Sequence, residues 1–159
     1  MKTITTIQQI THEDLVNLFS GALYGSPYLS VYYEADVDYD ADDCHEDIIA
    51  KILLNGGIVH LTDHRADGAV YGDLHCRVDD EELDVTYDVS LSDIIYGLER
   101  AANGTFNAGE NDKCFPNWRE RNIEQAKRSF NAFVWDEDAW DATNADYLMQ
   151  IILFDEIVY

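Results

Sequence analysis

Apolar residues recur along this chain with two different periods, and each period predicts one kind of element. Helical spacing follows Thr11 and Ser90, each with an Asp three residues later, which is the pattern of a helix start. These caps predict one helix over 11–23 and another after residue 90. The same spacing predicts helices over 43–55 and 116–130, and a last helix capped by Thr143 or Asn144.

Strict alternation of apolar and polar residues predicts strands instead. It is clearest in a hairpin at 70–89, whose strands 70–78 and 83–89 are joined by a turn over Asp79–Glu82. This register places Asp73 opposite Asp88, which sets like charges against each other. Shorter apolar runs predict strands over 28–33, 58–61 and 156–159. We therefore expect an α+β fold in one domain, 1–159, with an antiparallel sheet of about four to five strands packed against about four to five helices.

The charge balance changes this picture of an ordinary small domain. The chain has 32 acidic against 10 basic residues, a formal net charge of −22 and a pI near 4.1. Solubility alone is usually met by a net charge of about 2–8, and a larger charge disfavours the compact state by self-repulsion. The excess predicts recognition of a basic partner. It also disfavours direct binding to nucleic acid or to an anionic membrane.

The acidic residues fall into two zones. Residues 31–98 hold 18 acidic and three basic residues, and residues 135–159 hold seven acidic residues and no basic one. Residues 99–134 are nearly balanced. The middle of the chain is therefore self-neutralised, and the negative field comes from either side of it.

Three widely spaced cysteines and the absence of a secretion signal favour a reducing, cytoplasmic environment. The apolar run 147–154 is shorter than the ~20 residues of a membrane span, so we expect no membrane insertion. The sequence leaves open whether the protein is a monomer or a homodimer.

Candidate chemistry is sparse. Asp36, Asp38 and Asp40 match the start of an EF-hand loop, but Ala41 and Asp47 replace the required Gly and Glu. His60 and His64 lie at a strand end and a turn, where we interpret them as surface residues rather than metal ligands. The chain has no nucleophile elbow, Gly-rich phosphate loop or zinc signature. We therefore expect no enzyme activity, no cofactor and no assigned metal site.

Three acidic stretches carry a resemblance to a class of proteins: EADVDYDADDCHED, DDEELDVTYD and DEDAWDATNAD. The chain is similar in these stretches to the small acidic anti-defence proteins of phages and mobile elements, the DNA-mimicking antirestriction and anti-CRISPR inhibitors. The resemblance implies an inhibitor that occupies a basic nucleic-acid-binding surface of a host nuclease or CRISPR effector. Alternatives are a divalent-cation-binding protein, or a phage structural or assembly protein that uses its acids for solubility.

The residues expected to contact the basic partner are mainly carboxylates with two aromatic anchors, because aromatics often dominate binding energy at interfaces. They are Asp36, Asp38, Asp40, Asp42, Asp43, Asp79, Asp80, Glu81, Glu82 and Asp84, then Asp73 and Asp88, with Tyr39 and Trp140 as anchors.

Overall fold

The computed structural model describes residues 10–34 and 37–159 of the chain. Within these residues the protein has five helices and a four-stranded antiparallel sheet, which confirms the predicted α+β class. The helices are α1 (His12–Gly25), α2 (His45–Leu54), α3 (Leu91–Asn103), α4 (Trp118–Trp135) and α5 (Ala142–Phe154). The strands are β1 (Leu29–Tyr32), β2 (Val59–Asp63), β3 (Cys76–Val78) and β4 (Val85–Val89).

Local capping signals set the starts of α1 and α3. The Thr11 hydroxyl accepts a hydrogen bond from the Asp14 N–H at 3.1 Å, and the Asp14 carboxylate accepts one from the Thr11 N–H at 2.9 Å. Ser90 and Asp93 form the same reciprocal pair before α3. Both helix starts are therefore confirmed, because each pair satisfies N–H groups that the first turn leaves without partners.

The predicted cap of α5 is wrong. Asp141 caps this helix and accepts from the Asn144 N–H at 2.8 Å. The Asn144 side chain is engaged elsewhere, because it accepts from the Ser129 hydroxyl at 3.0 Å and donates to the Ala139 carbonyl at 2.7 Å. Asp and Asn both cap helices well, and the contact of Asn144 with Ser129 leaves Asp141 as the cap of α5.

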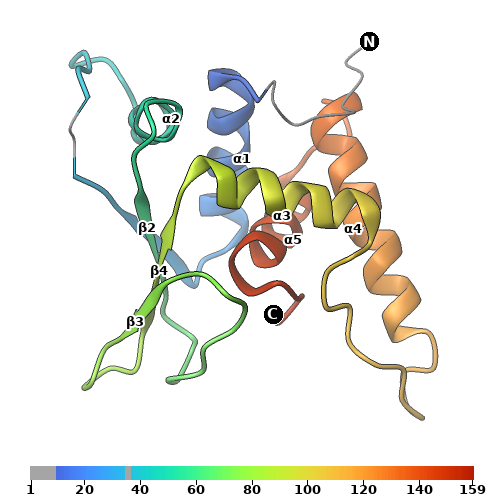
Figure 1. The fold of residues 1–159 in the computed structure, drawn as a ribbon. Coiled ribbons are helices and arrows are strands. Elements are labelled where there is room, and N and C mark those ends of the chain that lie inside the picture. Colours follow the sequence, from blue (N-terminus) through green and yellow to red (C-terminus); the bar gives the residue numbers. More distant parts are fainter. Residues whose placement is uncertain (1–9, 35–36) are drawn as a thin grey trace.

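Helix α5 lies at the centre of the helical half of the protein (Figure 1). It contacts α1, α3 and α4, and α2 packs against α1. Its buried residues include Leu148, Ile151, Ile152 and Leu153, which are at most 1% exposed. No helix in the described part of the chain is both long and apolar enough to cross a membrane.

The sheet has the strand order β1-β2-β4-β3, so β1 and β3 are its edges. Alternate residues such as Leu61, Val85 and Tyr87 are buried toward the helices, and the Tyr87 ring lies 5.5 Å from the Phe154 ring. Figure 1 shows α1, α3, α4 and α5 to one side of the sheet. The opposite side of the strands is left partly exposed.

The predicted hairpin is partly wrong. Strand β4 forms as expected, but its partner is only Cys76–Val78, and Arg77 lies opposite Thr86 instead of Asp84. The turn extends through Asp84, whose carbonyl accepts from the Asp79 N–H at 2.8 Å. Leu83 takes a left-handed conformation with φ 60° within this turn. The register is therefore shifted by two residues.

Residues 70–74 lie outside the sheet, and this segment packs over the end of α5. Gly72 has φ 70°, and a Cβ there would lie 3.0 Å from the Leu153 carbonyl oxygen, so the chain approaches α5 as closely as only glycine allows. The Tyr71 ring lies 5.7 Å from the Phe154 ring, and the Tyr71 N–H donates to the Tyr87 hydroxyl at 3.2 Å. This segment therefore covers the end of α5 and does not form the first part of the strand predicted over 70–78.

The last residues do not form the strand predicted over 156–159. Glu156 makes a single isolated bridge to Asn107. The N–H groups of Val158 and Tyr159 both donate to the side-chain oxygen of the fully buried Gln150, each at 2.8 Å. A buried side chain, rather than a neighbouring strand, therefore satisfies this part of the backbone.

Candidate functional site

The partly exposed side of the sheet, which we call the open face, carries polar side chains in two cross-strand rows. One row runs Ser30, Thr62, Thr86 and Arg77, and the other runs Tyr32, His60 and Asp88. Residues directly opposite one another in neighbouring strands project to the same face. Chemistry-bearing groups from four separate parts of the sequence therefore meet on one surface.

Asp88 lies in the middle of three basic groups. Its carboxylate is 2.5 Å from His60 Nδ1, 2.7 Å from His75 Nδ1 and 3.1 Å from the Arg77 guanidinium. Partial burial favours the neutral acid, but the hydrogen bonds from His60 and His75 and the charge of Arg77 outweigh it and hold the pKa of Asp88 below its ordinary value. The predicted opposition of Asp88 and Asp73 is therefore wrong, since Asp88 faces two histidines and the guanidinium of Arg77.

Asp84 is also engaged on the open face. Its carboxylate is 2.7 Å from His64 Nδ1, and His64 Nε2 is 2.8 Å from the Ser30 hydroxyl. The Ser30 and His64 side chains lie at the solvent-exposed surface. Three residues that are distant in the sequence thus form one continuous hydrogen-bonded chain.

The first predicted acidic segment follows β1. Asp36 lies outside the described residues, whereas Asp38, Tyr39, Asp40 and Asp42 are exposed. Asp43 is 2.6 Å from the Lys51 ammonium, and this hydrogen bond lowers the pKa of the Asp43 carboxyl. The Asp43 carboxylate is therefore paired with Lys51 of α2 and is a weaker candidate for a partner contact.

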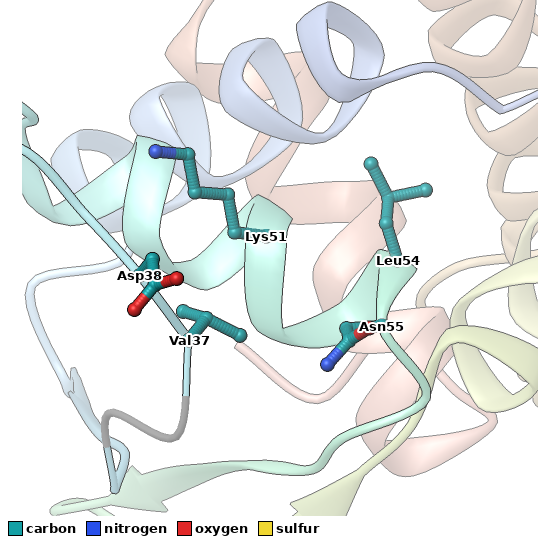
Figure 2. A pocket seen from close by; sticks show the side chains of 5 residues that line it. All are labelled: Val37, Asp38, Lys51, Leu54 and Asn55. Carbon is teal, nitrogen blue, oxygen red and sulfur yellow. The ribbon is translucent and has the colours of Figure 1, made fainter.

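Asp38 also borders a shallow hollow of about 520 Å³ beside α2 (Figure 2). Val37 and Asp38 line one side of it, and Lys51, Leu54 and Asn55 of α2 line the other. The hollow combines one carboxylate, one ammonium group and one amide with apolar side chains. It offers no paired acid and base for catalysis, because the ammonium of Lys51 is already held by Asp43.

The second predicted segment is the turn between β3 and β4. One carboxylate oxygen of Asp79 accepts from the N–H groups of Glu82 at 2.7 Å and Glu81 at 2.9 Å, and these bonds lower the pKa of Asp79. The side chains of Asp80, Glu81 and Glu82 are exposed. Asp79 therefore shapes the turn, and its three neighbours project from it.

The remaining predicted residues lie apart from these two segments. Asp73 is exposed in the loop that packs over α5. Trp140 is half-buried between α4 and α5, where its ring lies 5.2 Å from that of Phe133. It borders an acidic hollow of about 700 Å³, together with Glu13 and the residues 136–138. The structure therefore does not bring all of the predicted residues to one surface.

The two acidic segments lie near opposite ends of the sheet (Figure 1), and we call them its acidic corners. Residues 37–42 follow the end of β1 where Tyr32 pairs with His60, and the turn 79–84 precedes Val85 at the other end of β4. Five of the ten basic residues of the chain lie far along the sequence, between 113 and 128. The central carboxylate of the open face, Asp88, is thus paired within the protein, whereas the two acidic corners hold exposed carboxylates.

Sequence reasoning missed the centre of this site. His64 is exposed as interpreted, whereas His60 is half-buried, and Ser30, His75 and Arg77 were not expected to join them. The usable signal was the alternation in β2 and β4, which puts His60, Thr62, Thr86 and Asp88 on one face. Within the residues described, no group of three or more His, Cys, Asp or Glu side chains is arranged to hold a metal ion.

No protein-family model, curated protein or solved structure matches this chain.

Proposed function

We propose that this protein is a stoichiometric inhibitor that acts in the bacterial cytoplasm on a nucleic-acid-targeting defence complex. Its carboxylates occupy a basic nucleic-acid-binding surface of a nuclease or CRISPR effector and block substrate entry. Binding requires no chemistry on the partner. It is steered by charge and therefore weakens as salt is added.

The observation that supports this proposal is the separation of engaged from unengaged carboxylates. Asp43, Asp84 and Asp88 each bind a basic side chain of the protein itself. Within the two acidic segments, and among the described residues, six carboxylates form neither an ion pair nor a side-chain hydrogen bond: Asp38, Asp40, Asp42, Asp80, Glu81 and Glu82. These six lie in the two corner segments, where an external cation can reach them.

The distance between the two acidic corners also indicates how large the partner surface must be. Strands of four or five residues rise about 15 Å, and three strand spacings add about 14 Å across the sheet, so the corners lie roughly 20 Å apart. A single small cation cannot bridge that distance. A basic groove on a protein can, and it would contact both corners at once.

The test uses purified nucleases and CRISPR effectors in DNA-cleavage assays with increasing amounts of the protein. Two triple variants neutralise the corners: Asp38→Asn/Asp40→Asn/Asp42→Asn and Asp80→Asn/Glu81→Gln/Glu82→Gln. Exposed ion pairs contribute about 0.2–1 kcal/mol each, so we expect each triple variant to weaken inhibition roughly 10-fold. Wild-type inhibition should also weaken as salt rises.

A matched control removes the same charge from another surface, by Asp136→Asn/Glu137→Gln/Asp138→Asn. This variant should inhibit within about 3-fold of the wild type if the contact is local to the corners. Equal weakening by all three triple variants would show that only net charge matters, and would overturn the assignment of the corners. A wild-type protein that inhibits none of these enzymes at low salt would overturn the proposed function itself.

A further inference from the structure

The hydrogen-bonded chain on the open face has the connectivity of a nucleophilic triad. Ser30 comes from β1, His64 follows β2 and Asp84 precedes β4. The Ser30 hydroxyl is 2.8 Å from His64 Nε2, and Asp84 Oδ2 is 2.7 Å from His64 Nδ1. Each imidazole nitrogen thus has the partner that a general base needs, a hydroxyl at one and a carboxylate at the other.

We propose that Ser30 is a nucleophile that hydrolyses acyl esters, with His64 as its general base and Asp84 as the positioning residue. This activity is separate from inhibition and does not depend on it. Its substrate class is an uncharged or cationic ester, because the acidic surface of the protein repels anionic ones.

The other histidines show why this arrangement is specific. His60 and His75 each bind the Asp88 carboxylate through Nδ1, and His12 binds Asp47 through Nε2. His45 binds only the Tyr33 hydroxyl. Among the histidines that the structure describes, His64 alone joins a hydroxyl to a carboxylate, so only there can a proton leave a nucleophile for a ring oriented by an acid.

The edge position of β1 supplies a further group. The backbone N–H of His64 donates to the Tyr28 carbonyl at 2.9 Å, so Tyr28 and His64 form a hydrogen-bonded pair that extends the pairing of β1 and β2. Such pairs alternate along antiparallel strands with residues whose N–H groups point the other way. The backbone N–H of Val31 therefore points away from β2, toward the free edge next to Ser30. An amide at the residue after the nucleophile can stabilise the negative oxygen that forms on the substrate.

The reaction balances with water as the only co-reactant. Ser30 Oγ attacks the ester carbonyl carbon while its proton moves to His64 Nε2. The carbon–oxygen bond to the alcohol then breaks, and the alcohol leaves with that proton. Water next attacks the acyl–Ser30 ester, gives a proton to His64 and releases the carboxylic acid, which restores the Ser30 hydroxyl.

The test measures hydrolysis of p-nitrophenyl acetate and covalent labelling by a fluorophosphonate, with the adduct located by mass spectrometry. General base catalysis typically contributes about 10²–10⁴-fold, so we expect Ser30→Ala and His64→Ala to lower the rate at least 10-fold. The label should map to Ser30. His60→Ala, a histidine of the same face outside the triad, should keep the wild-type rate.

Asp84 needs a separate readout because it does not touch the substrate. We expect Asp84→Asn to lower kcat with KM unchanged and Asp84→Glu to restore part of the loss. A Ser30→Ala protein that hydrolyses and labels like the wild type would overturn the proposal, as would a label on another residue. Circular dichroism of each variant checks folding, and DNA-cleavage inhibition by Ser30→Ala separates this result from the proposed binding function.

Discussion

The helical half of this protein and the open face of its sheet differ in what their side chains contact. Helix α5 is enclosed by α1, α3 and α4, and its apolar residues are buried along most of its length. Side chains on the open face instead contact one another through hydrogen bonds at a surface that solvent reaches, as Thr62 and Thr86 do at 2.8 Å. One half is organised by apolar burial and the other by paired polar groups.

The difference indicates where most of the stability resides. Burial of apolar surface is the main favourable term in folding, so the helical half carries most of the stability. Exposed ion pairs and hydrogen bonds contribute much less. The open face can therefore hold a charge pattern suited to a partner with little effect on the fold.

The largest effect on stability is expected from a change at the contact between α3 and α5. A Cβ at Gly97 would lie 2.5 Å from Ile152 Cγ1 and 2.7 Å from the Ile152 backbone Cα. Because the backbone of α5 cannot move aside easily, we expect Gly97→Ala to lower the free energy of unfolding by about 3 kcal/mol. Chemical denaturation measures this loss, which corresponds to a fall in Tm of roughly 6–12 °C.

Glu99→Ala is the matched control, since Glu99 is exposed on the same helix. It should change Tm by less than about 2 °C. A Gly97→Ala protein that melts as the wild type does would show that the α3–α5 contact is not a main source of stability.

The helical half was also the more predictable half. The starts of α1 and α3 follow from capping pairs three residues apart, which are local signals. The start of α5 was not predicted correctly, because the side chain of Asn144 forms hydrogen bonds with Ser129 and Ala139 and does not cap the helix. Sequence reasoning thus succeeded where the deciding contact lies within one turn and failed where it lies between helices.

The sheet shows the same limit in another form. Alternation correctly placed Val85 and Tyr87 on the buried face, but the register of β3 against β4 was shifted by two residues. A shift by two leaves every side chain on its predicted face, so periodicity cannot detect it. The left-handed Leu83 lengthens the turn and fixes the true register.

Only part of the candidate site was predictable, namely its acidic segments and not the centre of the open face. Composition located the acidic segments, and the structure places them at two corners of the sheet. Which carboxylates are engaged could not be predicted, since the partners of Asp88 come from β2, from β3 and from His75 just before β3. The link between Ser30 and Asp84 through His64 also depends on pairing between distant strands.

A second prediction concerns the polar pairing of the open face. We expect Asp88→Asn to lower the free energy of unfolding by about 1–2 kcal/mol near neutral pH, because charge-assisted hydrogen bonds are lost. The folded pKa of Asp88 is lowered, so its ionised form stabilises the protein above about pH 4, and this stabilisation is lost as the pH falls through the folded pKa.

Denaturation at pH 6 and pH 3 measures this effect, and the variant should lose less stability between these values than the wild type does. Asp138→Asn is the control, because Asp138 is exposed between α4 and α5, outside the cluster of Asp88 with His60, His75 and Arg77. Identical acid sensitivity in the Asp88→Asn and wild-type proteins would contradict a stabilising role for the Asp88 cluster.

The smallest expected effect on stability belongs to the turn at the acidic corner. The exposed side chains of Asp80, Glu81 and Glu82 project from the turn, so neutralising all three by Asp80→Asn/Glu81→Gln/Glu82→Gln should leave Tm within about 2 °C of the wild type. Asp79→Ala in the same turn should lower Tm more, because Asp79 accepts two backbone N–H groups. Thermal unfolding of the two variants distinguishes Asp79, whose carboxylate stabilises the turn, from the three carboxylates that project from the turn into solvent. A triple variant less stable than Asp79→Ala would contradict that division, whereas an unchanged Tm together with weaker inhibition would show that these three carboxylates serve a partner and not the fold.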